Sequence, residues 1–209
     1  MSLDFLTPSA AASRDGADTP VACSPMESQA RAAGARFELR DGWSVAVEYP
    51  GAAPADTVGW TDTSHLPKYE LQGELDESLP FGTAVRRDGA WWCRLTPTRA
   101  LVIGGDSPRE GALDVTSNFA SLTLTGPLAR ETFARFCALD LRPHVTPVGA
   151  LRPGSIARQP GTLIHEADQR YLVLFGWATG EYVWNVVADA GGHLGGRPIG
   201  ADQLGALDA

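Results

Sequence analysis

An eleven-residue motif occurs twice in this chain and constrains the fold more than any other feature. The segment TSHLPKYELQG runs from Thr63 to Gly73, and TSNFASLTLTG runs from Thr116 to Gly126. Both copies share the opening Thr-Ser, a leucine near the end and the closing glycine, and an aspartate lies just before each. Aspartate, serine and threonine side chains bond backbone N–H groups at turns, and glycine lets a strand end sharply. The repeat therefore predicts two equivalent corners, each leading into a strand.

Two such corners indicate two related lobes. We expect one domain over residues 25–209, with pseudo-repeated lobes of about 25–112 and 113–209. Residues 1–24 are rich in Ala, Ser, Asp, Thr and Pro and lack periodicity, so a flexible tail is expected there. The alternative, that two short strand motifs coincide by chance, stays open.

Two Asp-Gly pairs flanked by alternating residues indicate β-hairpins over residues 36–49 and 83–95. Short strands are also expected at Ser155–Ala157 and Thr162–His165, after an irregular stretch from Pro143 to Pro153. The regular alternation of helix and strand that a parallel sheet would need is absent.

Two strands lead into helices. Phe119–Thr125 alternates and is followed by Gly-Pro and an apolar stripe, which predicts a helix over Leu128–Leu139. Arg170–Phe175 precedes a second helix, capped by Thr179 and expected to end at Gly191-Gly192. The predicted class is α+β, with antiparallel sheets and two strand-to-helix units.

The charge balance limits the partners. The formal net charge is −8 over 209 residues, which disfavours nucleic acid and anionic membranes. No apolar run approaches the roughly 20 residues of a membrane helix, and the first residues do not resemble a signal peptide, so a cytoplasmic protein is expected. Three dispersed cysteines without a Cys-x-x-Cys pattern argue against a disulfide framework and against a metal site.

Several segments resemble one superfamily. Gly34–Phe37, Gly42-Trp43, Glu48-Tyr49 and Val58–Lys68 are similar to the opening of glycine cleavage T-proteins, which are aminomethyltransferases. Asp114 to Asp140 and Tyr171 to Ala190 resemble the sarcosine oxidase gamma subunit more closely. Gly196–Ala201 is similar to the T-protein segment before its final domain. The resemblance covers residues 25 to 205 and implies a folate-binding fold of the T-protein and gamma-subunit type.

The resemblance also implies where a ligand would bind. T-proteins bind tetrahydrofolate, with one carboxylate beside the reactive nitrogen and a second, in a Tyr-Thr-Gly-Glu stretch, holding the pterin. The first site falls near Gly82–Asp88, where only Asp88 is acidic, and the second near Gly161–Asp168, where Glu166 is the candidate. Ala178–Glu181 imitates the second motif but follows the strand, so a helix cap is expected there. The sequence also ends before the further domain of a T-protein would begin.

Six residues are therefore candidate ligand contacts, and each has a structural alternative. His65 and Asn118 occupy the same motif position, where a turn residue bonding to backbone is the alternative. Asp88 serves equally well in a hairpin turn. Trp92 could stack on a planar ring or pack in a core. His165 and Glu166 could anchor a pterin or amine, or lie in a solvated loop.

Two functions follow from the resemblance. The first is an accessory or ligand-binding subunit of one-carbon and amine metabolism that packs on a larger flavin-containing oxidase subunit. The second is a small stand-alone enzyme that uses the central funnel in which T-proteins bind tetrahydrofolate. It would transfer one carbon with tetrahydrofolate there, or act on another small molecule. Self-association, which would cover an open apolar face, is a third arrangement. The sequence does not decide whether the chain is catalytic.

Overall fold

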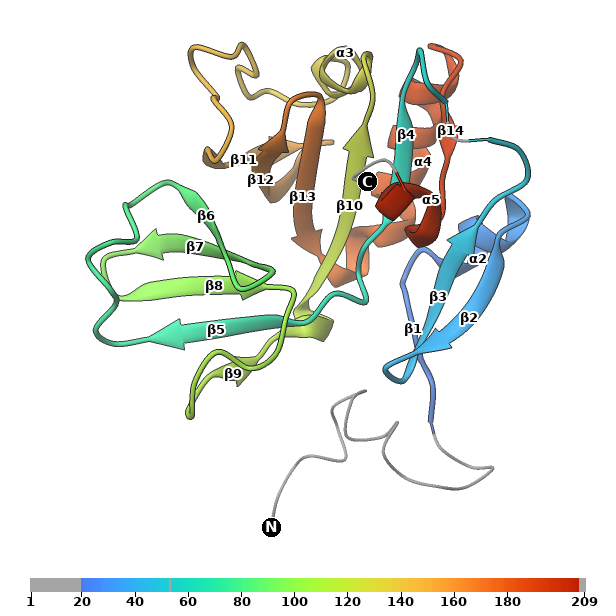
Figure 1. Ribbon diagram of the computed structural model, residues 1–209. Helices are drawn as coiled ribbons and strands as arrows, with labels where there is room; N and C mark the ends of the chain where they lie inside the picture. The colour runs from blue at the N-terminus through green and yellow to red at the C-terminus, as the bar shows by residue number, and fades with distance from the viewer. Residues whose placement is uncertain (1–19, 53, 207–209) are drawn as a thin grey trace.

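The computed structural model describes residues 20–52 and 54–206 and has a mixed α+β architecture (Figure 1). Three sheets, mostly antiparallel, have the strand orders β1-β3-β2, β11-β12-β13-β10-β4-β14 and β6-β7-β8-β5-β9. We refer to them as the small, six-stranded and five-stranded sheets. The four helices in the described residues are α2 (Glu27–Ala32), α3 (Ala129–Ala134), α4 (Gly180–Gly192) and α5 (Ala201–Ala206).

The strands of each sheet have the following bounds. The small sheet contains β1 (Ala22–Cys23), β2 (Arg36–Arg40) and β3 (Trp43–Glu48). The six-stranded sheet contains β4 (Gly59–Asp62), β10 (Phe119–Thr125), β11 (Leu151–Ile156), β12 (Gln159–Ala167), β13 (Arg170–Gly176) and β14 (Arg197–Pro198). The five-stranded sheet contains β5 (Lys68–Gln72), β6 (Ala84–Arg87), β7 (Ala90–Thr96), β8 (Arg99–Ile103) and β9 (Leu113–Asp114).

Ordered structure begins before Pro25. Ala22–Cys23 pair with β3 in parallel, inside the segment expected to be a tail, and residues 1–19 of that segment lie outside the described residues. Arg197–Pro198 form a second short parallel pairing, with β4. Two-residue pairings carry no periodic signal, which is why the sequence pattern did not indicate them.

The two Asp-Gly hairpins are confirmed. Asp41 and Gly42 join β2 to β3 with φ of 49° and 80°, and Asp88 and Gly89 join β6 to β7 with φ of 47° and 80°. Positive φ at both central residues is the type I′ geometry whose twist matches that of the flanking strands. Aspartate and glycine tolerate it better than most residues, so the local sequence was sufficient to place these turns.

A third hairpin corrects the sequence-based expectation for residues 151–167. The structure has a longer pair, β11 and β12, with six residues in register; it contains the expected strand Thr162–His165 and, of the expected strand Ser155–Ala157, only the first two residues. The turn between them contains Ala157 and Arg158, with φ of 49° and 61°. Neither residue type favours a positive φ, and Pro153 and Pro160 lie within the strands, so the sequence signals for this hairpin were misleading.

The helix predicted over Leu128–Leu139 is shorter than expected. It ends at Ala134, because the chain turns and Cys137 forms an isolated antiparallel bridge with Ile156. The second helix, α4, continues through both glycines that were expected to stop it. Position 191 accommodates glycine for packing and not for helix termination, because a Cβ there would be 2.8 Å from the ring of Trp60. Thr179 is the N-cap residue, but its Oγ1 donates to the Gly176 carbonyl (2.8 Å).

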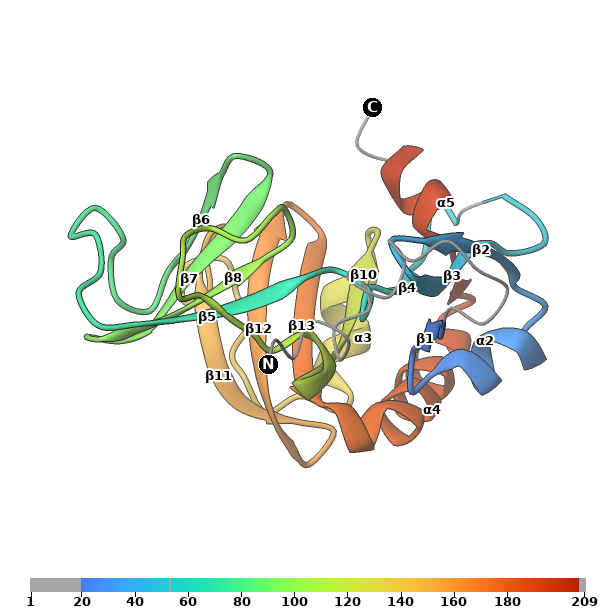
Figure 2. The same ribbon diagram turned by 90° about the horizontal axis from the view of Figure 1, so that it is seen from below.

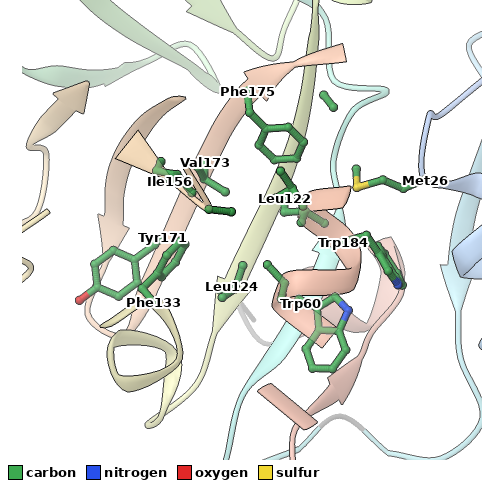
Figure 3. Packing of buried hydrophobic residues seen from close by; sticks show 14 of the residues in the cluster. Met26, Trp60, Leu122, Leu124, Phe133, Ile156, Tyr171, Val173, Phe175 and Trp184 are labelled. Atoms are coloured by element: carbon green, nitrogen blue, oxygen red, sulfur yellow. The ribbon is translucent and has the colours of Figure 1, made fainter. Parts of the chain in front are cut away.

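The six-stranded sheet carries a core on each face. Leu122 and Leu124 of β10 and Val173 of β13 point toward α3 and α4, where they pack with residues that include Phe133 and Trp184 (Figure 3). Trp184 also meets Trp60 edge-on, with ring centroids 6.4 Å apart. The other face packs against the five-stranded sheet through a cluster made of Ala84, Trp91, Cys93, Leu101, Ile103, Val115, Leu151, Ile164, Leu172 and Leu174.

The two larger sheets share a strand order. In the five-stranded sheet, β5 lies between β9 and β8, followed by β7 and β6; in the six-stranded sheet, β10 lies between β4 and β13, followed by β12 and β11. The strand after each motif copy therefore has equivalent neighbours in both sheets. However, β4, which precedes the first motif copy, belongs to the six-stranded sheet, and β9, which precedes the second copy, belongs to the five-stranded sheet. The division into lobes at residue 112 therefore stays a prediction.

Candidate functional site

The two motif copies are the connections between the two larger sheets. The first leads from β4 of the six-stranded sheet into β5 of the five-stranded sheet, and the second leads from β9 back into β10. The connections run side by side near the middle of the molecule (Figure 1). We call this region the crossover; it consists of residues 62–68 and 114–121.

The hydrogen bonds across the crossover are reciprocal. The Thr63 backbone N–H donates to the Ser121 carbonyl (3.0 Å), and the Lys68 backbone N–H donates to Thr116 Oγ1 (2.9 Å). The start of the first copy is therefore bonded to the middle of the second, and the middle of the first is bonded to the start of the second. The strand register agrees, because Asp62 lies opposite Leu122 and Asp114 lies opposite Tyr69.

Both aspartates before the motif form the same turn. Asp62 Oδ1 accepts the Ser64 N–H at 2.9 Å, and Asp114 Oδ1 accepts the Thr116 N–H at 2.9 Å. These contacts are Asx turns, the turn chemistry that the motif predicted. The repeat is therefore explained by the way in which the chain passes between sheets.

The crossover encloses a lysine that the sequence did not single out. Lys68 is 0% exposed, and its Nζ donates to the carbonyls of Ser64 (3.0 Å) and Leu66 (2.8 Å). Burial lowers the pKa of Lys68 to about 7, and the carboxylates of Asp62 and Asp114 oppose that shift. The repeat could have drawn attention to Lys68, because aligning the two motif copies puts this lysine at the position that the small Ser121 occupies in the second copy.

Asp62 is a buried carboxylate that interacts with this lysine. Burial raises the pKa of Asp62, while hydrogen bonds from Ser24 and Ser64 and the charge of Lys68 oppose the rise. Burial also raises the pKa of Tyr49, with a smaller contribution from Asp62. The Tyr49 hydroxyl and Thr61 Oγ1 are buried and have no hydrogen-bond partner among the described residues. The crossover is a dense polar core, and Lys68 Nζ is enclosed and held by carbonyls, so it is not presented to a substrate.

His65 lies at the same corner. Burial lowers the pKa of its imidazole to about 4, and the charges of Lys68 and Arg40 add to the shift. The folded chain therefore excludes a proton that an unfolded chain binds below about pH 6.5.

Acidification is expected to destabilise the protein through His65. Between about pH 6.5 and pH 4 the unfolded state binds more protons than the folded state at this position, so stability falls as the pH falls. Urea unfolding at about pH 7 and pH 5 should show a smaller loss for His65→Asn than for the unchanged chain. Ser117→Ala, an exposed and non-titrating change in the second copy, should keep the full loss. An equal loss in His65→Asn would show that this imidazole does not contribute.

Glu166 joins the two larger sheets. Its Oε1 accepts a hydrogen bond from Trp91 Nε1 at 2.7 Å, and its Oε2 accepts one from Arg170 Nε at 3.1 Å. Trp91 belongs to β7 and Glu166 to β12, so this carboxylate connects residues from different sheets. Both of its oxygens already have partners, which leaves it poorly placed to hold a pterin.

Glu166→Gln is expected to lower the free energy of unfolding by about 1–3 kcal/mol, because a bond to a charged partner is lost and one amide group must pair with two donors. Chemical denaturation measures the change. Glu181→Gln is the matched control, since Glu181 is an exposed carboxylate in the first turn of α4 and should change stability by less than about 1 kcal/mol. Equal effects of the two substitutions would contradict the connecting role of Glu166.

The other candidates lie apart from one another. His165 lies on the opposite face of β12, where it stacks on Tyr171 with centroids 4.5 Å apart and its Nδ1 donates to the Thr146 carbonyl (2.9 Å). Trp92 packs on the outer face of the five-stranded sheet with Arg87 over its ring. Asp88 is an exposed turn residue, and Asn118 is exposed in a short 3-10 helix within the crossover. The six predicted residues do not converge on one site.

Cavities lie on either side of the six-stranded sheet. One of about 540 Å³ is lined by residues of β10, β11, β12 and β13, among them Phe119, Pro153, Pro160, Thr162 and Leu174. Another of about 310 Å³ lies on the α3 side and is lined by residues that include Arg130, His165, Asp168 and Tyr171. The first cavity is largely apolar and includes Phe119, which follows the predicted residue Asn118. The second cavity includes the predicted residue His165 itself.

Comparison with solved structures decides the fold. The gamma subunit of the heterotetrameric sarcosine oxidase from Corynebacterium sp. U-96, solved in complex with pyrrole 2-carboxylate, matches 82% of this chain and 95% of its own length. The identity is 19% and the TM-score 0.64. The chain has the fold of the sarcosine oxidase gamma subunit. The predicted resemblance is confirmed at the level of the fold.

A second solved structure agrees. The aminomethyltransferase T of the glycine cleavage system from Bartonella henselae matches 88% of this chain at 13% identity, with a TM-score of 0.68. The match covers 61% of that protein, so this chain spans about three fifths of the T-protein length. No family model matches the chain, and no curated protein matches it.

Neither a metal cluster nor a membrane-spanning helix is found within residues 20–52 and 54–206. In that part of the chain, no group of three or more His, Cys, Asp or Glu side chains is placed to hold a metal ion. Over the same ranges, none of the helices is long and apolar enough to cross a membrane.

Proposed function

We propose that this chain is an accessory subunit that packs on a larger, flavin-containing subunit of an oxidase in amine and one-carbon metabolism. The observation that carries the proposal is the fold: a subunit of a heterotetrameric oxidase superposes on this chain with a TM-score of 0.64 over 95% of its own length. The engagement of Glu166 by Trp91 and Arg170 supports it, because the candidate pterin anchor already has a structural role.

Purification from the source cells tests this proposal. The chain, tagged and expressed at its natural level, should elute with a larger protein that shows the visible absorbance of a flavin. The ratio of the two proteins should be constant across the peak. Elution of the chain alone, or only with its own copies, would reject the accessory role.

A second candidate function is favoured by one observation. The cavity of about 540 Å³ lies on the side of β12 and β13 that faces the five-stranded sheet, and its volume is within the range of small-molecule sites. A folate or another small planar ligand would be its occupant. Calorimetric titration with tetrahydrofolate should give saturable heat if this function is retained, and no heat at high micromolar concentration would exclude the folate version.

A further inference from the structure

The smaller of the two cavities described above, of about 310 Å³, lies at one end of the six-stranded sheet. Helix α3 covers the face of this sheet that is turned away from the five-stranded sheet (Figure 2). The turn between β12 and β13 and the segment between α3 and β11 lie at the same end of the sheet as α3 (Figure 1). Residues from these parts of the chain line the cavity, which we call the α3 cavity.

The floor of the α3 cavity is a buried aromatic pair. His165 and Tyr171 are 4% and 3% exposed, and their rings stack with centroids 4.5 Å apart. The hydroxyl of Tyr171 points away from the other labelled side chains of the core (Figure 3). His165 Nδ1 donates to the Thr146 carbonyl, so Nε2 of the neutral ring is an acceptor. Among residues 20–52 and 54–206, this buried Nε2 has no hydrogen-bond partner, so it lacks a donor.

Two opposite charges line the cavity together with this pair. Arg130 of α3 and Asp168 of the β12–β13 turn are both lining residues. Burial raises the pKa of Tyr171, the charge of Arg130 lowers it and the charge of Asp168 raises it, so both charges lie close enough to act on the phenol. In the part of the chain that the structure describes, neither residue forms an ion pair. The other acidic residues nearby in the sequence each pair with an arginine: Glu131 with Arg135, Asp140 with Arg142 and Glu166 with Arg170.

The remaining walls are mainly apolar and are held in place. They consist of Pro127, Pro143, Pro147, Val148 and Gln169. Each proline ring fixes the backbone angle φ of its residue. The Gly149 N–H donates to the His165 carbonyl (2.8 Å), and the Gly126 N–H donates to the Gln169 carbonyl (3.0 Å). These bonds join the walls to β12 and to the β12–β13 turn, so little conformational entropy is lost when a ligand binds.

We propose that the α3 cavity binds an α-amino acid with an aliphatic side chain. The carboxylate pairs with Arg130, the ammonium group pairs with Asp168, and the side chain packs on the proline rings. A simple anion would lie beside the unpaired carboxylate of Asp168, and a simple cation would lie beside the unpaired guanidinium of Arg130. A ligand with both charges satisfies both residues, and its ammonium group supplies the donor that His165 Nε2 lacks. The volume is at the lower end of the range of small-molecule sites, as expected for a ligand with few atoms.

Calorimetric titration of the purified chain with L-leucine tests the inference. We expect saturable binding, and binding at least about 10-fold weaker for isocaproate, which lacks the ammonium group, and for isoamylamine, which lacks the carboxylate. Arg130→Gln and Asp168→Asn should each weaken L-leucine binding by about 10-fold or more, because one charged pair is lost. Arg135→Gln and Asp189→Asn are the matched controls; they change exposed residues outside the cavity lining and should bind L-leucine as the unchanged chain does.

Each result supports or overturns the inference. Thermal melting confirms that each variant is folded, and the titrations of the unchanged chain with the two analogues need no variant. Absence of saturable heat with L-leucine at millimolar concentration would overturn the inference, and so would isocaproate binding as tight as that of L-leucine. L-leucine binding that neither Arg130→Gln nor Asp168→Asn weakens would place the ligand elsewhere. The inference goes beyond the accessory function, which copurification tests separately and which stands if the amino-acid site fails.

Discussion

Lys68→Met is expected to lower the free energy of unfolding by about 2–5 kcal/mol, because two buried carbonyls lose a charged donor, at about 1–3 kcal/mol for each group left unsatisfied. The ammonium group is fully enclosed, and its loss leaves the Ser64 and Leu66 carbonyls without their donor and Asp62 without a cation that favours its charged form. Methionine has a similar length, so the change removes the charge with little loss of volume. Urea unfolding at about pH 7 measures the effect.

A double-mutant cycle isolates the part that comes from Asp62. Asp62→Asn keeps an oxygen that can accept the Ser64 N–H and removes the buried carboxylate. In that background, Lys68→Met should cost at least about 1 kcal/mol less than in the unchanged chain, because no carboxylate is left unpaired. An identical cost in both backgrounds would mean that the two side chains do not interact.

Gly200→Ala is expected to lower the free energy of unfolding by about 3 kcal/mol, at the upper end of the usual range for overpacking. A Cβ at this position would lie 2.1 Å from the Val47 carbonyl carbon and oxygen and 2.2 Å from the Glu48 nitrogen. These are backbone atoms of β3, so no side-chain rotation can relieve the overlap. The glycine is needed because the chain between β14 and α5 packs directly on β3, where Gln203 also bonds the backbone of Tyr49.

Gly205→Ala is the control for this prediction. Gly205 lies in α5, further along the chain, and a Cβ there would meet nothing within 4 Å. Alanine favours helix over glycine, so this variant should be as stable as the unchanged chain or more stable by up to about 1 kcal/mol. Similar losses from both substitutions would attribute the effect to helix α5 as a whole and contradict the close approach to β3.

Short-range chemistry made much of the fold predictable from sequence. The Asp41-Gly42 and Asp88-Gly89 pairs placed two hairpins, and the aspartates before each motif copy placed two Asx turns. The hairpin at Ala157 and Arg158 was not predictable, because its turn residues do not favour positive φ and tertiary pairing of β11 with β12 imposes it. The early end of α3 has the same origin, in a bridge between Cys137 and Ile156.

The candidate site was less predictable, because its contacts span long sequence separations. Glu166 meets Trp91 across 75 residues, and no local pattern indicates that pairing. His165 and Glu166 are adjacent in sequence, yet strand alternation sends them to opposite faces of the six-stranded sheet. The crossing of the two motif copies, which encloses Lys68, depends on two sheets that are assembled from both halves of the chain.

Native mass spectrometry of the chain isolated from its source cells tests the proposed accessory role most directly. We expect a complex whose mass exceeds that of the 22.1 kDa chain by at least one larger subunit with a bound flavin. A single species at 22.1 kDa, or a multiple of that mass without flavin, would contradict the accessory role.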